Sequence, residues 1–167
     1  GIDTRLNGTL DVEGRLQAPL TGQGQFTLTD SRISGRPITG RGSLTLADRR
    51  FDADVELRSG DARLTALGGL GNGRELQVEL VAPEIEPLVP GYAGRLDVRA
   101  TIAGEIEAIR MSAAAAATDL RIPGGHRIAS LVTSFNGGLA ANEPLAVTVK
   151  LSGHTSPGGP DSSLAGA

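Results

Sequence analysis

Few side chains in this sequence could do chemistry, and the most suggestive are two pairs of glutamates. Glu84 and Glu86 flank one isoleucine and Glu105 and Glu107 flank another, so each pair would share a face of an extended segment. Paired carboxylates can serve as general acid and base. Glutamates at solvated edges are far commoner, and we interpret both pairs in that way. No catalytic residue is predicted, and the chain is not expected to be an enzyme.

Metal and cofactor sites are not indicated by the sequence either. The chain has no cysteine and only two histidines, His126 and His154, and no His/Asp/Glu set has the spacing of a metal site. The segment GGLGNG from Gly68 resembles a phosphate-binding glycine loop but lacks the lysine and helix that should follow it. A hairpin turn is predicted there instead, and no cofactor is predicted for the chain.

Charge and composition exclude further classes of partner. The net charge is −3, without the basic field that nucleic acid requires, so no nucleic-acid partner is predicted. No apolar run reaches the length of about 18 residues that a membrane-spanning helix needs. Only 2% of the residues are aromatic and 24 are glycine, so the dry parts of the fold must be built from Leu, Val, Ile and Ala.

Apolar and polar residues alternate along nearly every segment of the chain. Between Phe51 and Leu57, for example, every second residue is apolar and those between are acidic. This period of two is typical of strands with one dry and one wet face, which favours antiparallel pairing. Hairpin signals separate several of the segments: Ser59-Gly60-Asp61, Gly71-Asn72-Gly73 and Asn136-Gly137-Gly138. The predicted fold class is all-β, an antiparallel meander.

Two segments depart from this simple alternation. MSAAAAATDL, from Met111 to Leu120, has the alanine content of a helix but no amphipathic stripe, and its neighbours are predicted strands. We predict a strand there and keep a helix as the alternative. The segment from Ala82 to Ala93 contains Pro83, Pro87 and Pro90, so no central strand can pass through it. It is predicted to be a connector with room for one short helical turn.

An internal repeat is the strongest long-range pattern. GTLDVEGRL from Gly8 matches GRLDVRATI from Gly94, and TDSRISG from Thr29 matches TDLRIPG from Thr118. Such self-similarity predicts a stacked array of β-units, although a chance match in a glycine-rich β chain is the alternative. The predicted units are a first repeat at 1–93 with its connector at 82–93, a truncated second repeat at 94–153, and a disordered tail at 154–167.

Strands with one apolar face must hide that face. They can pair with a second sheet as a filled sandwich, or they can surround an apolar groove, and the shortage of aromatic side chains leaves room for a groove. Such a groove would suit acyl chains, or apolar strands of a client protein. Its predicted lining consists of Leu10, Val12, Val55, Leu57, Leu64, Val78, Leu96, Val98, Ile102, Val147 and Val149.

The segment APEIEPLVPGYAGRLDVRATIAGEIEAIRMSAAAAATDLRIPG resembles the TamB family, the AsmA-like component of the translocation and assembly module. GTLDVEGRLQAP, from Gly8 to Pro19, is similar to the repeat form of that family, small-x-Leu-x-Val-x-Gly-x-Leu-x-x-Pro. The resemblance covers residues 1–153. It implies a meander curled into a β-taco-like groove built of repeats. It also implies phospholipid passage between the inner and outer membranes, support of outer-membrane protein assembly, or both.

The same resemblance implies a location and partners. Members of the family are tethered to the inner membrane of Gram-negative bacteria and lie in the periplasm, so the tether is expected in a segment outside this sequence. The expected partners are phospholipid acyl chains or apolar client strands, and an outer-membrane barrel of the TamA type, which would bind a region absent here. The alternative to this function is a structural or adhesive β-repeat with a filled core and no ligand groove.

Overall fold

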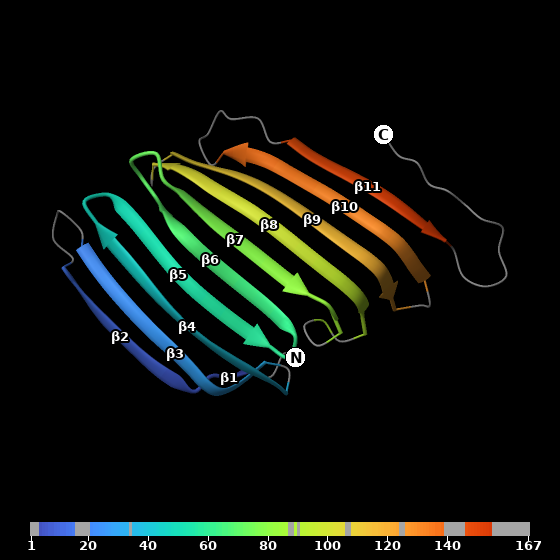
Figure 1. Ribbon diagram of the computed structural model, residues 1–167, viewed down its shortest axis with the longest axis horizontal. Coiled ribbons are helices and arrows are strands. Elements are labelled where there is room, and N and C mark those ends of the chain that lie inside the picture. Colours follow the sequence, from blue (N-terminus) through green and yellow to red (C-terminus); the bar gives the residue numbers. More distant parts are fainter. Residues whose placement is uncertain are drawn as a thin grey trace.

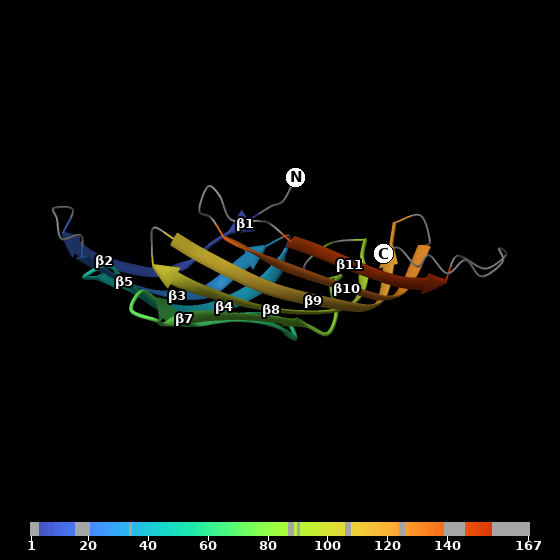
Figure 2. The ribbon, with the colours of Figure 1, turned by 90° about the horizontal axis from the view of Figure 1, so that it is seen from above.

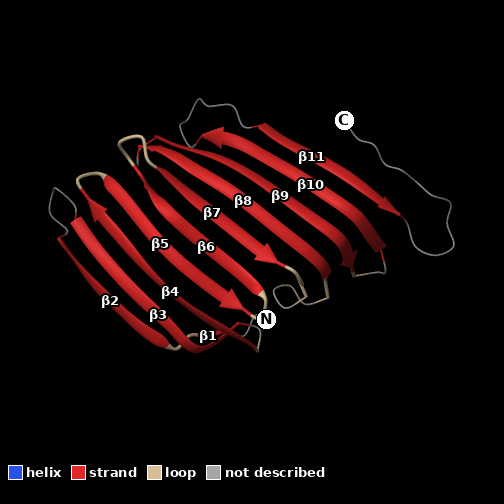
Figure 3. Ribbon diagram, in the orientation of Figure 1, coloured by secondary structure: helices blue, strands red, loops and turns tan. Residues whose placement is uncertain are grey.

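The computed structural model describes residues 4–15, 21–33, 35–86, 89, 91–105, 108–123, 126–138 and 146–154. They form one 11-stranded antiparallel sheet in which successive strands are neighbours, with β1 and β2 both paired to β3 at one edge (Figure 1, Figure 3). The predicted all-β meander is confirmed. The strands are β1 (Thr4–Arg5), β2 (Gly8–Arg15), β3 (Thr21–Ile33), β4 (Arg36–Ala47), β5 (Arg50–Ser59), β6 (Ala62–Leu70), β7 (Glu75–Ala82), β8 (Ala93–Glu105), β9 (Ala108–Ile122), β10 (His126–Gly138) and β11 (Ala146–His154).

The register aligns the apolar positions of neighbouring strands. Residues directly opposite one another in an antiparallel pair lie on the same side of the sheet. One row of such partners crosses the sheet from β2 to β10 without a polar member: Leu10, Phe26, Gly42, Val55, Ala66, Val78, Ala100, Ala113 and Phe135. We call the side of the sheet that carries this row the apolar face, and the opposite side the polar face.

The described strands make a single layer. Strands in substantial contact are sheet neighbours, apart from a small approach of β6 to β8, and no second layer covers the apolar face within the described ranges. Figure 2 shows an open, gently curved sheet. The strong curl implied by the family resemblance is therefore not seen here. Sheets curve where bulges bend their strands, and the register shifts among the described pairings lie only near one end of the long strands, at Leu28/Ser31, Ala93/Arg95 and Arg127/Ser130.

Two of these irregularities contain the Thr-Asp motif that the sequence repeats. Asp30 in β3 and Asp119 in β9 both have a left-handed backbone, with φ of 52° and 51°. Aspartate tolerates this conformation better than most residues because its short side chain can bond locally. The end of the sheet that contains both motifs rises on one side in Figure 2, where the adjoining ends of β3, β4, β9 and β10 turn upward.

The turn predictions had mixed outcomes. Gly60 and Asp61 form a two-residue hairpin between paired Ser59 and Ala62, and the Gly71-Asn72-Gly73 turn is confirmed by three positive φ angles. The turn predicted at Asn136-Gly137-Gly138 is wrong. These residues belong to β10 because β9 is long enough to provide their partners, from Ser112 back to Arg110.

The alanine-rich segment is a strand, as predicted. Met111–Leu120 lies inside β9, which pairs along its length with β8 on one side and β10 on the other. Its helix propensity is overridden because both neighbours offer ladder hydrogen bonds and extend the same apolar face.

The proline-rich connector begins after Ala82, which is the last residue of β7. The amide of Val89 donates to the carbonyl of Ile85 at 2.9 Å, which is the single helical turn predicted for this segment. Ile85 is only 6% exposed, and its amide donates to the Gly94 carbonyl of β8 at 2.8 Å. Pro87, Leu88 and Pro90 lie outside the described residues. The connector is thus attached to the sheet by an apolar side chain and a backbone bond.

The predicted tail at 154–167 is not tested. His154 is the last residue of β11, where it pairs with Arg127 of β10, and 155–167 lie outside the described residues.

Gly40 of β4 supplies a test of the packing between strands. A Cβ at this position would lie 2.6 Å from the Glu56 carbonyl oxygen and would collide with the Leu57 side chain, so Gly40→Ala forces the backbone of β5 to move. We expect the substitution to lower the free energy of unfolding by about 1–3 kcal/mol. Urea denaturation followed by circular dichroism measures this loss.

Gly22→Ala in β3 is the matched control, since its Cβ would meet nothing closer than 3.5 Å. It should leave stability unchanged or raise it by about 0.4–1 kcal/mol through the unfolded chain. Equal losses for the two variants would contradict the close approach of β4 and β5.

Candidate functional site

The structure brings the predicted lining residues to one side of the sheet. Leu57, Leu64, Leu80 and Val98 are partners across four strands, and Ile102 lies opposite Leu76. By the same register, Leu10, Val12, Val55, Val78 and Leu96 also belong to the apolar face. Val147 and Val149 pair with Phe135 and Thr133 of β10, but their side chains lie outside the described part of the chain. That these residues line a groove remains a prediction.

Other apolar-face residues were not among the predicted lining. Phe26 and Phe135 belong to the central row. The alternation around Phe26 was the signal that could have included it, whereas the residues before Phe135 do not alternate strictly. Ile85 had no such signal, because it lies in an irregular connector rather than in a strand. Its burial nevertheless places an apolar side chain next to one end of the sheet.

The apolar face is best covered near the two ends of its strands. At one end Ala53, Leu70 and Leu76 form a small buried cluster, against which Phe51, Ala66, Val78, Ile102 and Ile109 pack. At the other end Ala82 is completely buried and Ala117 nearly so. The connector begins there, and in Figure 2 the adjoining strand ends turn upward on one side. The burial of Ala82 and Ala117 indicates that this is the apolar side.

Between these ends the face is half-buried or exposed, most of all at the β2 edge. Leu10 and Val12 are each 70% exposed. The small residues Gly42, Ala66, Ala100 and Ala113 are interspersed among the larger ones along the central row. The ring of Phe26 occupies the space above Gly42, since a Cβ there would lie 2.5 Å from its Cε1 atom. The result is a broad, shallow apolar surface.

Ion pairs organise the polar face. The Glu56 carboxylate of β5 forms ion pairs with Arg58 at 2.7 Å, Arg63 at 3.2 Å and Arg41 at 3.9 Å. The hydrogen bond from Arg58 is the main cause that lowers the pKa of the Glu56 carboxyl. These charged groups are solvated, so each pair contributes little to stability. Their effect is to keep this face wet and to leave the other face as the candidate binding surface.

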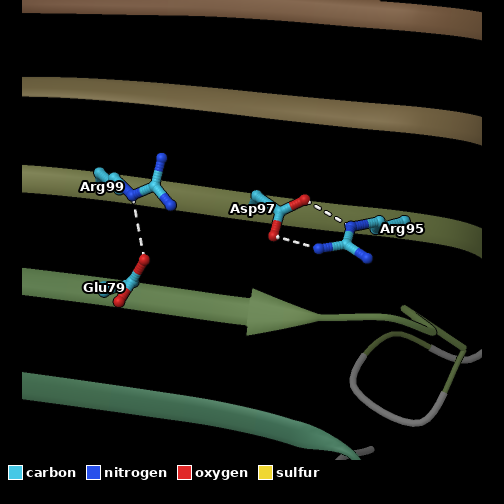
Figure 4. A network of polar contacts seen from close by, with 4 residues as sticks. All are labelled: Glu79, Arg95, Asp97 and Arg99. Carbon is cyan, nitrogen blue, oxygen red and sulfur yellow. Dashed lines mark hydrogen bonds and ion pairs between the residues drawn. The ribbon is translucent and has the colours of Figure 1, made fainter.

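A second set of ion pairs joins β7 and β8 on the same polar face (Figure 4). Arg99 Nε donates to Glu79 Oε1 across the two strands at 3.0 Å. Within β8, Arg95 donates two hydrogen bonds to Asp97, at 2.6 and 3.0 Å. These bonds hold the pKa of the Asp97 carboxyl below its usual value of 3.8 and raise the pKa of the Arg95 guanidinium.

Among the described residues, neither the clefts nor the potential catalytic groups indicate another site. Four clefts formed by described residues, of about 390 to 550 Å³, are lined in large part by polar side chains, as with Arg99, Thr101 and Ser112 in the cleft over β8 and β9. No cluster of three acidic or histidine residues that could hold a metal occurs within the described ranges. Of the glutamate pairs, Glu86 makes an ion pair with Arg36 at 2.5 Å and Glu105 accepts from the Asn72 amide at 3.1 Å, while Glu107 is not described.

Comparison with known proteins gives one match. The family model described as TamB, N-terminal domain, matches residues 1–155. No curated protein and no solved structure matches the chain. No helix among the described residues has the length and apolar character needed to cross a membrane.

Asp97 allows the electrostatics of the polar face to be measured. Because Arg95 stabilises the charged carboxylate, Asp97 should titrate below its usual pKa of 3.8. A lowered folded-state pKa adds stability at higher pH, and this is lost as the pH falls through the folded value. Carboxyl-carbon NMR should show the Asp97 pKa rising toward 3.8 in Arg95→Gln. Arg127→Gln is the control, which should instead raise the pKa of Asp119, and an ordinary pKa for Asp97 in the unaltered chain would refute the assignment.

Proposed function

This chain belongs to the TamB family through its N-terminal domain, and from that premise we propose that its apolar face carries phospholipid between the inner and outer membranes. Support of outer-membrane protein assembly on the same face, through apolar client strands, is the companion role. Neither role requires a chemical step, and we propose that the chain acts without catalysis. It would lie in the periplasm of a Gram-negative bacterium, tethered to the inner membrane by a segment outside this sequence.

One observation carries the proposal: a continuous apolar row crosses a single-layer sheet. Leu10, at one end of the row, is 70% exposed, and the row continues through eight more strands to Phe135. Each methylene of an acyl chain that leaves water for such a surface contributes about 0.8 kcal/mol. Acyl chains need no hydrogen-bond partner, and the row offers them none. A continuous surface of this kind would allow chains to move from strand to strand without a polar barrier.

The groove is a further part of the proposal. The left-handed residues Asp30 and Asp119 lie where the long strands bend, and the connector approaches the sheet at the same end through Ile85. Together these features supply a raised wall on the apolar side. We propose that stronger bending at such positions completes a β-taco-like groove lined by the predicted residues.

The division into repeats is likewise proposed. The two Thr-Asp motifs adopt the same backbone at equivalent places in a long strand, which supports a first unit at 1–93 and a second at 94–153. The units would not be separate domains, since β7 and β8 pair directly from Glu75 to Ala82. An outer-membrane barrel of the TamA type would bind the protein through a region outside this chain.

The alternative, a structural or adhesive repeat with a filled core, requires a second layer on the apolar face. The described strands provide none. No observation among the described residues favours this alternative, and a charge placed on the apolar face distinguishes it from the groove.

A charge on the apolar face tests the proposed function. Val98→Asp in β8 places a carboxylate between Leu80 and Ala115 on that face. On an open face water can reach the charge, so the fold should survive, whereas in a filled core the unfolding cost should reach several kcal/mol. Photo-crosslinking to phospholipid vesicles, with the probe at Ala100, should fall several-fold while the thermal midpoint changes by only a few degrees.

Thr101→Asp is the matched control, because Thr101 lies on the polar face of the same strand opposite Gln77. It should alter neither crosslinking nor stability. If Val98→Asp unfolds the chain and the unaltered chain gives no lipid crosslink, the filled core is correct and the proposed function fails.

A further inference from the structure

One end of the apolar face is covered by the chain itself. β5 and β7 end there and β8 begins there (Figure 1). Ala62, Ala82 and Ala117, which we call the alanine row, lie on the apolar face toward this end, and all three are buried. Leu64 and Leu80, one row further in, are only half-buried. Neighbours within a single layer can shield a small side chain, but the complete burial of Ala82 requires a group above it.

The covering group is the segment 83–86, which follows β7 and which we call the strap. Ile85 in this segment is buried, and its amide donates to the Gly94 carbonyl near the start of β8 at 2.8 Å. The Ile85 carbonyl in turn accepts from the Val89 amide at 2.9 Å. The strap thus leaves β7 at Ala82 and is held against β8, so its apolar side chain lies at the ends of these two strands.

An ion pair fixes the strap on the apolar side of the sheet. Arg36 Nη2 lies 2.5 Å from Glu86 Oε2, which joins β4 to the strap. Alternate residues of a strand share a face, and Arg36 is in step with Gly42 of the central row, so it belongs to the apolar face. β5 and β6 lie between β4 and β7 in the sheet. The pair therefore spans the ends of two strands on the apolar side.

The contacts that hold the strap are of a kind that opens readily. Both partners of the Arg36–Glu86 pair are about half exposed, and such pairs contribute little to stability. The Ile85 amide makes a single backbone bond, outside the regular ladder of β7 and β8. Segments held by few contacts open locally at a small fraction of the free energy of global unfolding. The strap can therefore leave the face while the sheet stays folded.

We propose that the strap is a latch on the apolar face. While the Arg36–Glu86 pair holds it, acyl chains are kept off the alanine row, and release of the pair opens this row to them. The inference rests on the proposed transport of phospholipid, since it concerns regulation of the same face. Ile85 and an acyl chain compete for one apolar surface, so a change that weakens the pair shifts the population toward the open state.

Photo-labelling of the full 167-residue chain tests the latch. The probe is a vesicle of phosphatidylethanolamine and phosphatidylglycerol in which one phospholipid carries a diazirine near the end of an acyl chain. Tandem mass spectrometry locates the label. The measured quantity is the ratio of label on Leu96 and Ala117, paired residues of β8 and β9 beside the strap, to label on Ala100 and Ala113, paired residues of the same strands in the central row. In the unaltered chain we expect label chiefly in the central row.

Glu86→Gln removes the ion pair with almost no change in size. We expect it to raise the labelling ratio about two- to fivefold, which is the effect of losing an exposed ion pair. Hydrogen exchange at the Ile85 amide should become faster by a similar factor. The charge exchange Arg36→Glu with Glu86→Arg restores the pair and should return both values toward those of the unaltered chain. Glu84→Gln is the matched control, because it removes the same charge from the strap and leaves the Arg36–Glu86 pair in place.

Ile85→Ala removes the apolar contact of the strap instead of its charge. It should raise the labelling ratio at least about tenfold, because the strap loses its buried side chain. Val89→Ala is the matched control, since Val89 is exposed, and it should leave the ratio unchanged. Circular dichroism checks that each variant remains folded.

Two outcomes overturn the latch while leaving the proposed function intact. One is label on the central row with an unchanged ratio in Glu86→Gln, which would show that the ion pair does not control access. The other is equal label on both pairs of residues in the unaltered chain, which would show that the strap excludes nothing. Absence of label from the central row in every variant would instead defeat the proposed function, and the latch with it.

Discussion

The structure depends on the register that keeps alternate residues of successive strands in step. A slip of one residue in any pair would move the apolar side chains of that strand to the polar face. Short turns such as Gly60-Asp61 prevent this, because they leave Ser59 directly opposite Ala62. Where the long strands depart from regular pairing, the irregularity lies near their ends, at Asp30 and Asp119. The centre of the sheet therefore keeps an unbroken apolar row from Leu10 to Phe135.

The same period of two gives the two faces of the sheet opposite properties. On the polar face, Glu56 is surrounded by three arginines and Glu79 pairs with Arg99, so charge remains in water and is locally balanced. On the apolar face, glycine and alanine in the central row keep the surface shallow and leave room for neighbours such as Phe26, whose ring occupies the space above Gly42. Aromatic residues in place of Gly42 or Ala113 would fill this space and interrupt the surface. The low aromatic content of the chain thus reflects the need to keep the apolar face shallow, and it is not the sign of a weak core.

Period-two alternation was sufficient to predict an antiparallel meander. The alanine-rich β9 was predicted from its strand neighbours instead, and it is a strand because pairing with β8 and β10 outweighs helix propensity. It could not predict the turn correctly at Asn136-Gly137-Gly138, because whether those glycines pair depends on how far the partner strand extends. The alternation could not predict where the sheet curves either. The backbone angles of Asp30 and Asp119 determine where strands bend, and in the sequence they appear only as a repeated Thr-Asp. The burial of Ile85 follows from the path of the connector, for which no periodic signal exists.

A single-layer sheet leaves its apolar face without a covering layer among the described strands, and the chemistry of that face separates the ligands that it can take. The face lacks only nonpolar contact, so it suits acyl chains, which are fluid and form no hydrogen bonds. A polar ligand would give up its hydrogen bonds with water there and would gain none from the central row, which has no polar member from Leu10 to Phe135. The continuity of the row and the absence of polar members along it therefore favour the same class of ligand.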